Sequence, residues 1–465
     1  MASLRFTLNG RAIDASGADP NQTLLLWLRE RGLTGTKEGC SEGECGACAV
    51  VLVREGADGE TRYVPVNSCL FLLASAADQE ILTVEGVADG ELHPVQRAMV
   101  DLGGSQCGYC TPGFIMSLFA EYYRSGRADS GFDLESIAGN LCRCTGYRPI
   151  RDAGRSLPMV GDGDPHAARL ARPAPAAEPV EYALGSRRFF RPTTLAEATR
   201  VYAEHPDATI VCGGTDLVVE LNQRLRRLET ILSLEAIAEL RGFDDADDAL
   251  TIGAAVPLSE IEERLGGEPR LLGDLFPLFS SKLIRNRATL GGNLATASPI
   301  GDSPPALLAL GAQVIAASVH GERAIELDAL FTGYRQTALK EGELIARVRI
   351  PKPYPQIGRF YKVSKRVHDD ISTVAAGFAI DLDASGTVTA ARLAYGGVAA
   401  TPVRATEAEA ALVGKPWSAA SIAEAKTKAA GAFSPMTDQR GSADYRAAMV
   451  TSLLDKLWAQ TGARA

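Results

Sequence analysis

Residues 39–48 are GCSEGECGAC, and this run constrains the chain more tightly than its overall composition does. Cys40, Cys45 and Cys48 have the spacing C-x4-C-x2-C, and Cys69 is the next cysteine along the chain. Three closely spaced cysteines with a distant fourth are typical of plant-type [2Fe–2S] clusters. The glycines at 39, 43 and 46 can adopt positive φ, so the backbone can bring N–H groups towards the sulfurs. A structural zinc site is the alternative, and a C-x4-C pair fits it poorly.

A second group of four cysteines follows. Cys107 and Cys110 form C-x2-C, whereas Cys142 and Cys144 form C-x-C, and both pairs lie at the edges of predicted helices. Four thiolates at facing helix ends can hold either a cluster or a zinc ion. Zinc ligands are usually two to four residues apart, so the C-x-C pair favours a cluster.

The composition excludes some functions. The chain has 465 residues and a net charge of −9, which argues against a nucleic-acid partner because phosphate backbones attract basic surfaces. The N-terminus, MASLRFTLNG, has no secretory pattern, and the apolar stretch 306–319 is too short to cross a membrane. We therefore expect a cytoplasmic protein without a membrane partner. Grouped cysteines in a reducing compartment indicate metal, whereas the isolated Cys212 is expected to be a buried strand residue.

Changes in sequence pattern predict an α+β multidomain fold. Alternating residues 4–8 and the apolar run 49–53 predict strands, and residues 21–31 predict a helix, as in a ferredoxin-like β-grasp domain. Helices are predicted at 94–102, 112–124 and 134–139. The predicted domains are a plant-type [2Fe–2S] domain (1–88), a helical [2Fe–2S] domain (89–158), a linker rich in alanine and proline (159–181), a non-Rossmann FAD-binding domain (182–354) and a C-terminal α/β flavoprotein subdomain (355–465).

Strands and helices then alternate. Strands are predicted at 208–212, 231–234, 250–252, 374–382 and 388–395, and helices at 258–265, 406–412, 419–432 and 444–458. Two glycine-rich turns lie in this region, in ATIVCGGTDL (208–217) and RATLGGNLATASPIGDSPP (287–305). Their backbone N–H groups can form an anion-binding nest for a pyrophosphate. They are equally compatible with ordinary turns, and the chain has neither a Rossmann nor a P-loop fingerprint.

The cysteine motifs resemble those of a known family. The sequences TGTKEGCSEGECGACAV (34–50), GSQCGYCTPGFIMS (104–117) and GNLCRCTGYRPI (139–150) resemble, in order, the two cluster loops of the xanthine dehydrogenase and aldehyde oxidase family of molybdenum hydroxylases. The resemblance implies two [2Fe–2S] clusters, one held by Cys40, Cys45, Cys48 and Cys69 and the other by Cys107, Cys110, Cys142 and Cys144.

The two glycine-rich turns resemble the FAD-binding turns of the same family. The FAD contacts that this implies are Ile210, Val211, Cys212, Gly213, Gly214, Thr215, Asp216, Leu217, Phe279, Thr289, Leu290, Gly291, Gly292, Asn293, Asp302, Leu344 and Lys362. The segments LFTGYRQT (330–337) and YKVSKRVHDDIS (361–372) resemble the xanthine dehydrogenase branch. They either face a nicotinamide cofactor, NAD, or are solvated surface.

The resemblance also implies a partner. Single-chain members of the family continue into a molybdopterin-binding region, so we expect molybdopterin and the residues that hydroxylate substrate only on a large partner subunit, in a dimer of heterodimers. Electrons from hypoxanthine or xanthine would pass through the helical-domain cluster, the ferredoxin-type cluster and FAD to NAD⁺. The alternatives are the same component of a hydroxylase for aldehydes or N-heterocycles, and a zinc-binding scaffold without enzymatic activity.

Overall fold

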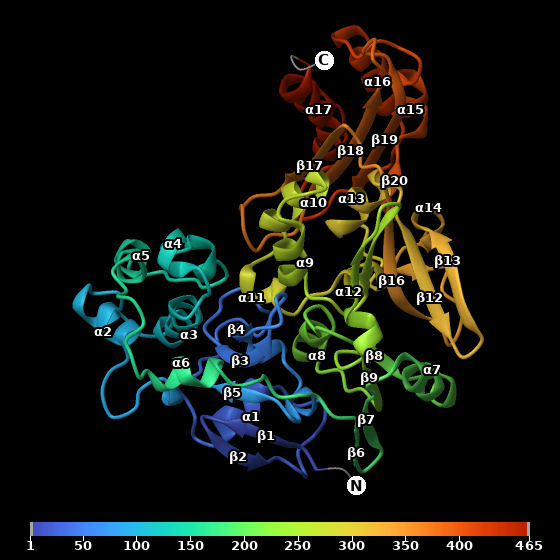
Figure 1. Ribbon diagram of the computed structural model, residues 1–465. Helices are drawn as coiled ribbons and strands as arrows, with labels where there is room; N and C mark the ends of the chain where they lie inside the picture. The colour runs from blue at the N-terminus through green and yellow to red at the C-terminus, as the bar shows by residue number, and fades with distance from the viewer. Residues whose placement is uncertain (1–2, 463–465) are drawn as a thin grey trace. The chain divides into compact units, whose positions relative to one another are not determined.

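The first five strands form one mixed sheet in the computed structural model of the chain, which describes residues 3–462 (Figure 1). The elements are β1 (Arg5–Leu8), β2 (Arg11–Asp14), α1 (Leu24–Glu30), β3 (Ala49–Glu55), β4 (Thr61–Asn67) and β5 (Glu80–Leu82). The strand order is β2-β1-β5-β3-β4, with β1 and β5 parallel and the other neighbours antiparallel. Thr23 caps α1 by accepting a hydrogen bond from the N–H of Leu26, so the helix starts later than predicted.

Five short helices follow the sheet. They are α2 (Pro94–Asp101), α3 (Thr111–Tyr122), α4 (Arg127–Ser130), α5 (Arg148–Arg155) and α6 (Pro165–Leu170). Helix α3 is buried on nearly all sides and shares a core with β3, where Phe114 and Phe119 pack in the same cluster as Val51. The helix predicted at 134–139 is only the 3-10 helix Leu134–Ile137, and Gly139 follows it with a φ of +97°.

The segment predicted as a linker contains helix α6. Asp164 caps this helix by accepting hydrogen bonds from the N–H groups of His166 and Ala167. The His166 ring contacts the rings of Phe119 and Tyr123, and the Tyr123 hydroxyl donates to the Asp164 carboxylate at 2.9 Å. This segment is therefore fastened to the helical region. An Asp-Pro pair is a helix-start signal that the alanine- and proline-rich composition obscured.

A second, four-stranded sheet has the order β6-β7-β9-β8. Strands β7 and β8 both run parallel to β9, and β6 is an antiparallel edge. The elements are β6 (Val180–Leu184), β7 (Arg187–Arg191), α7 (Leu195–Glu204), β8 (Thr209–Val211), α8 (Leu217–Arg224) and β9 (Thr230–Ser233). The predicted strands 208–212 and 231–234 are confirmed to within two residues.

Contacts divide the chain into two units. The first contains residues 1–237 and 281–288, including α11 (Lys282–Arg285), and the second contains 238–280 and 289–465. All eight clustered cysteines belong to the first unit. The boundaries of the predicted domains stay a prediction, because these units join several of them.

The second unit has two main sheets. A five-stranded antiparallel sheet has the order β10-β11-β16-β12-β13, a hairpin pairs β14 with β15, and an antiparallel sheet has the order β17-β18-β19-β20. The strands are β10 (Phe243–Asp245), β11 (Ala249–Gly253), β12 (Gln313–Ser318), β13 (Gly321–Glu326), β14 (Phe331–Gly333), β15 (Gln336–Thr337), β16 (Leu344–Pro351), β17 (Ile357–Val363), β18 (Val374–Leu382), β19 (Val388–Gly396) and β20 (Val403–Arg404).

The helices of the second unit fall into two groups. The first group comprises α9 (Leu258–Leu265), α10 (Arg270–Leu275), α12 (Leu290–Ala295), α13 (Ser303–Ala309) and α14 (Leu327–Leu330). The second comprises α15 (Thr406–Leu412), α16 (Ala419–Ala429) and α17 (Ala443–Thr461), which bury one face of the β17–β20 sheet. The predicted multidomain α+β fold is confirmed.

Within residues 3–462, no helix combines the length and apolar character that a bilayer crossing requires.

Candidate cofactor sites

The first cysteine group gathers at one end of the five-stranded sheet. Cys40 and Cys45 lie in the loop before β3, Cys48 directly precedes that strand, and Cys69 lies in the 3-10 helix Ser68–Leu70 after β4. The Sγ atoms of Cys48 and Cys69 are 3.3 Å apart. The four thiols thus lie at the open end of the β3–β4 hairpin, where Ala49 pairs with Asn67, which explains why a distant fourth cysteine can join the loop.

Within this group, the pKa values of Cys40 and Cys45 are shifted in opposite directions. A hydrogen bond from the Cys45 thiol, and further N–H groups from Glu42, Cys45 and Glu44, lower the pKa of Cys40 to about 5 although burial opposes this. The same thiol–thiol bond raises the pKa of Cys45. N–H groups that stabilise one thiolate are available to stabilise the negative charge of a cluster.

Glycines line the first cysteine loop, as predicted. Gly43 and Gly46 have φ values of +87° and +65°. Gly39 does not have positive φ, but a Cβ there would lie 2.7 Å from the Cys45 Sγ atom. The prediction of positive φ is therefore correct at two of the three glycines, and the third is needed for close approach to a sulfur.

The second cysteine group lies between helices. Cys110 directly precedes α3, and the loop with Cys142 and Cys144 lies before α5. The Tyr109 N–H and then the Cys144 thiol lower the pKa of Cys107. Burial and the bond to Cys142 raise the pKa of Cys110 to about 12.

The thiols meet as pairs. Cys48 and Cys69 are in direct contact, and the pKa shifts of the other thiols indicate the pairs Cys40 with Cys45, Cys107 with Cys144 and Cys110 with Cys142. Across residues 3–462, no three Cys, His, Asp or Glu side chains converge as they would on a single metal ion. Two thiolates on each of two irons is the donor set that a [2Fe–2S] cluster requires, so both groups fit such a cluster.

The first glycine-rich turn connects β8 to α8 in the first unit. Gly214 has a φ of +75°, and a Cβ at Gly213 would lie only 1.9 Å from the Arg287 carbonyl oxygen, so a side chain is excluded there. Cys212 lies after the end of β8 and is half-buried, so the prediction that it is a buried strand residue is wrong. The strand ends early because its partner β9 pairs only as far as Val211.

The second glycine-rich turn begins α12 in the second unit. Thr289 caps this helix by accepting a hydrogen bond from the Gly292 N–H at 3.1 Å, and the Gly291 N–H donates to Ala254. A Cβ at Gly292 would lie 3.0 Å from the Thr289 hydroxyl oxygen. The N–H groups of both glycines are thus already bonded within the chain, so this turn does not present them as the predicted anion-binding nest, and Gly292 is half-buried.

Several further predicted FAD contacts lie together in the second unit. The Lys362 ammonium donates to the Asp302 carboxylate at 2.8 Å and to the carbonyl of Leu278, beside Phe279, at 2.9 Å. The Asn293 amide oxygen accepts from Ser303, which follows Asp302 and so joins the second turn to this pair. Lys362 and Asp302 have side chains only 2% and 10% exposed.

Leu344 is the first residue of β16, buried under the sheet, and α12 packs on that strand. The hydroxyls of Thr289 and Ser303 and the ammonium of Lys362 are polar groups of the kind that a phosphate-bearing flavin needs, and all three are buried and bonded to other groups of the chain. The residues present therefore fit FAD in kind.

The two segments compared with nicotinamide-binding regions have exposed middles and buried ends. Residues 330–337 include the β14–β15 hairpin, with Tyr334 at its tip. Residues 364–371 form a loop in which the Asp370 carboxylate accepts hydrogen bonds from the N–H groups of Lys365, Arg366 and Ile371. Ser372, at the end of this loop, donates to Asp302.

Sequence reasoning missed several residues that organise these sites. Arg287 supports the first turn and Ser372 supports Asp302, although both were inside the segments singled out. Asn222 was not singled out at all, and its amide donates to two carbonyls of the first cysteine loop region. No local pattern marks a side chain whose partner is more than 150 residues away.

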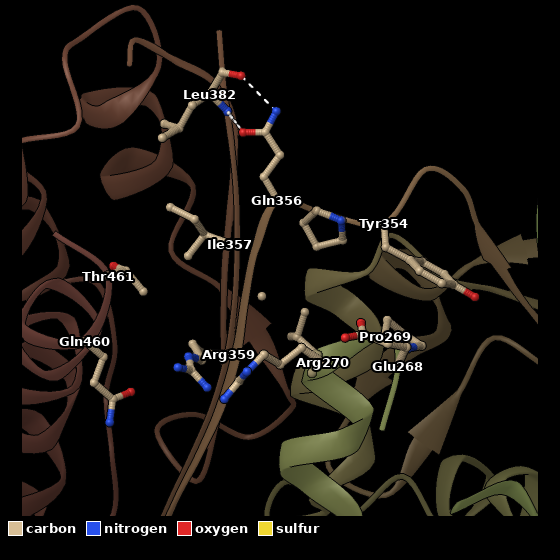
Figure 2. Close-up of a pocket in the computed structure, with 13 residues that line it drawn as sticks. Glu268, Pro269, Arg270, Tyr354, Gln356, Ile357, Arg359, Leu382, Gln460 and Thr461 are labelled. Atoms are coloured by element: carbon tan, nitrogen blue, oxygen red, sulfur yellow. Dashed lines mark hydrogen bonds between the residues drawn. The ribbon is translucent and has the colours of Figure 1, made fainter. Parts of the chain in front are cut away.

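The second unit also has a pocket of about 320 Å³ between the starts of α10 and β17 and the end of α17 (Figure 2). The guanidinium groups of Arg270 and Arg359 point into the same space, beside Gln460. Both share the carboxylate of Asp274, at 3.8 and 3.4 Å. No predicted FAD contact lines this pocket, so it lies outside the predicted cofactor site.

The fold and the paired thiols define an iron–sulfur flavoprotein, and comparison with known families agrees. Four family models match in succession: "2Fe-2S iron-sulfur cluster binding domain" over residues 6–74, "[2Fe-2S] binding domain" over 83–155, "FAD binding domain in molybdopterin dehydrogenase" over 183–353 and "CO dehydrogenase flavoprotein C-terminal domain" over 359–461. The chain belongs to the molybdenum hydroxylase family.

Curated relatives include the xanthine dehydrogenases of Emericella nidulans, at 34% identity over 89% of this chain, and Drosophila pseudoobscura pseudoobscura, at 32% over 98%. The chain spans 35% and 39% of the lengths of these relatives.

Similar solved structures include CO dehydrogenase from Oligotropha carboxidovorans, with 28% identity and a TM-score of 0.57. That match covers 61% of this chain and all of the other. Quinoline 2-oxidoreductase from Pseudomonas putida 86 has 28% identity and a TM-score of 0.54, over 60% of this chain and 97% of the other.

Proposed function

We propose that the chain is the iron–sulfur and FAD component of a xanthine dehydrogenase, which receives electrons from a molybdopterin-binding partner and delivers them to NAD⁺. The observation that carries this proposal is the placing of eight cysteines in two separate four-cysteine groups within one unit, one at the open end of the β3–β4 hairpin and one in the loops before α3 and α5. The similarity to xanthine dehydrogenases of two organisms supports the choice of purine substrate.

The ligands and contacts would be those that the sequence implies. Cys40, Cys45, Cys48 and Cys69 would hold one cluster, and Cys107, Cys110, Cys142 and Cys144 the other. FAD would contact residues 210–217 and 289–293, together with Phe279, Asp302, Leu344 and Lys362. Bound flavin couples one-electron carriers to a two-electron acceptor, and the chain supplies position, charge and exclusion of water.

The chain's own groups have definite roles in this proposal. The N–H groups around Cys40 stabilise the thiolate, and they would also stabilise the negative charge that a cluster places in the loop. The ion pair of Lys362 and Asp302 keeps a positive and a negative group fixed beside the predicted flavin contacts. No residue for substrate hydroxylation is assigned to this chain, because that chemistry would belong to the partner subunit.

A second candidate is the same component of a hydroxylase for another substrate. The match to quinoline 2-oxidoreductase, which extends over 97% of that chain, favours an N-heterocycle in this case. The electron-transfer role of this chain is the same in both candidates, and substrate choice would distinguish them.

The test is a measurement of iron, sulfide and flavin, with a visible spectrum, on the chain purified with its natural partner. We expect about four irons, four sulfides and one FAD per chain, and bleaching when hypoxanthine is added. Zinc without flavin would contradict the whole proposal. Full cofactors with bleaching by an N-heterocycle, but not by hypoxanthine, would favour the second candidate.

A further inference from the structure

Helix α8 is bonded directly to the backbone that carries the first cysteine group. The side-chain amide of Asn222 donates one hydrogen bond to the Ser41 carbonyl at 2.8 Å and another to the Cys69 carbonyl at 2.9 Å. An amide NH₂ has two donors, so both are used. One side chain thereby joins the residue after Cys40 to Cys69, at the two ends of the group.

The loop that Asn222 holds has an unusual backbone conformation. Ser41 has a φ of +58°, which costs energy for a residue with a Cβ and persists only where surrounding contacts fix it. The Ser41 hydroxyl donates to Glu38 at 2.7 Å, and the Gly43 carbonyl accepts from Asn67 at 2.9 Å. The Asn222 amide contributes the bond to the Ser41 carbonyl itself, so it helps to fix the orientation of that peptide.

The same helix begins at the first glycine-rich turn. The turn contains Gly213 and Gly214, and α8 starts at Leu217. A Cβ at Gly214 would lie 3.3 Å from the Leu70 carbonyl oxygen, so this turn approaches the backbone next to Cys69. The predicted flavin turn and the first cysteine group are therefore neighbours within one unit, with α8 fixed to both.

Arg287 makes a second connection between these segments. Its Nε donates to the Gly213 carbonyl at 3.0 Å, its guanidinium lies 4.2 Å from the centre of the Phe71 ring, and it forms an ion pair with Glu235. Phe71 is two residues after Cys69. The Arg287 side chain is 3% exposed, so this connection is also shielded from water.

We infer that Asn222 is a positioning residue that sets the place of the first, ferredoxin-type cluster relative to the flavin turn. The inference rests on the proposed function and adds to it a residue that positions the cluster. Loss of its two donors leaves the Ser41 and Cys69 carbonyls without this partner and frees the Ser41 peptide to reorient. The cluster ligands remain, so the cluster is kept but moves relative to the turn.

The experiment compares the wild-type holoenzyme with Asn222→Ala and Asn222→Asp. The aspartate has the size of asparagine but lacks the donors and adds a negative charge, whereas the alanine lacks the donors without adding charge, so an effect common to both variants reports the lost hydrogen bonds. Gln223→Ala is the matched control, because the neighbouring, exposed Gln223 amide donates to the half-buried Glu42 carboxylate and not to a backbone carbonyl of the cysteine loop. Iron and flavin contents are measured first.

Electron transfer is then measured directly. A light flash reduces the flavin with EDTA as the electron donor, and one electron passes from the reduced flavin to an oxidised cluster, which bleaches. We expect both Asn222 variants to keep iron and flavin, to shift the EPR signal of one reduced cluster and to slow this bleaching by about tenfold or more, because geometry-dependent steps are sensitive to displacements near 1 Å. Gln223→Ala should match the wild type.

Each other outcome overturns the inference in a distinguishable way. A bleaching rate and EPR signal equal to the wild type would show that Asn222 does not position the cluster, although the proposed function would stand. Loss of two irons in both Asn222 variants would show that the residue is needed for assembly and not for positioning. A wild-type protein without iron and flavin would contradict the proposed function and this inference together.

Discussion

Individual residues decide whether the cysteine groups can hold clusters. Cys48 is buried and bonded to Cys69, whereas Cys212 lies outside both groups. We expect Cys48→Ser to reduce the iron content from about four to about two per chain, since each cluster contains two irons. Cys212→Ser should keep all of the iron. Iron analysis with EPR of the reduced protein checks this, and equal iron in the two variants would contradict the assignment of ligands.

The ion pair of Lys362 and Asp302 allows a prediction about stability. Because both side chains are almost fully buried, Lys362→Met leaves an uncompensated charge on Asp302 and should lower the free energy of unfolding by about 3–5 kcal/mol. Adding Asp302→Asn removes that charge and should restore much of the loss. Denaturant unfolding of the flavin-free protein measures both, and a double variant no more stable than the single one would contradict this explanation.

How far the sequence could predict the site differs from residue to residue. The spacing of the first cysteine group predicted a cluster, because a loop that wraps a cluster needs its ligands and glycines close together along the chain. The spacing of the second group left zinc as an alternative, and only the family resemblance decided between them. Asn222 contacts Ser41, which is 181 residues earlier, and Arg287 contacts Gly213, which is 74 residues earlier. Such contacts depend on how elements pack, and periodicity carries no information about them.

Among the elements, those with strong periodicity were predicted well and those fixed by tertiary contacts were not. Helices α9 and α15 and strand β18 have the predicted bounds. Leu258 and Ile261, three residues apart, are buried on α9, and α15 and β18 contribute apolar residues to one core. Helix α6 was missed because its short sequence has no apolar stripe. It is held by the Asp164 cap and by ring contacts of His166 with Phe119 and Tyr123.

Helix α2 and the linker meet at His93, which allows a prediction about pH. The His93 ring caps α2, lies 2.9 Å from the Tyr123 hydroxyl and faces His166, and burial followed by the charge of His166 lowers its pKa to about 4. The unfolded chain has a histidine pKa near 6.5 and binds more protons between these values. The contribution of His93 to the free energy of unfolding is therefore fully present above about pH 6.5, and about 2 kcal/mol of it is lost as the pH drops towards 4.

The variant His93→Asn separates titration from structure. Asparagine is a good N-cap residue, so it keeps the start of α2 but cannot titrate. We expect a smaller loss of stability between pH 6.5 and 4 than in the wild type, measured by denaturant unfolding at each pH. An identical pH dependence in the two proteins would show that groups other than His93 control the acid response.

At the scale of the whole molecule, the two units divide the proposed functions unequally. Every cysteine of both groups lies in the first unit, and so do residues 210–217 of the predicted flavin contacts. The ion pair of Lys362 and Asp302 and the exposed loop 364–371 lie in the second. The clusters should therefore survive changes confined to the second unit, whereas delivery of electrons to an external acceptor should require both.

Removal of the flavin from the holoenzyme tests this division. Because no flavin contact is predicted among the eight clustered cysteines, the flavin-free protein should keep about four irons per chain and still be bleached by dithionite. NADH should no longer bleach it, because a hydride donor needs a two-electron carrier to feed one-electron clusters. Added FAD should restore the response to NADH. If iron leaves together with the flavin, the clusters depend on the flavin for their stability. If NADH bleaches the flavin-free protein, FAD is not the point of contact with the nicotinamide, and the proposed route to NAD⁺ is wrong.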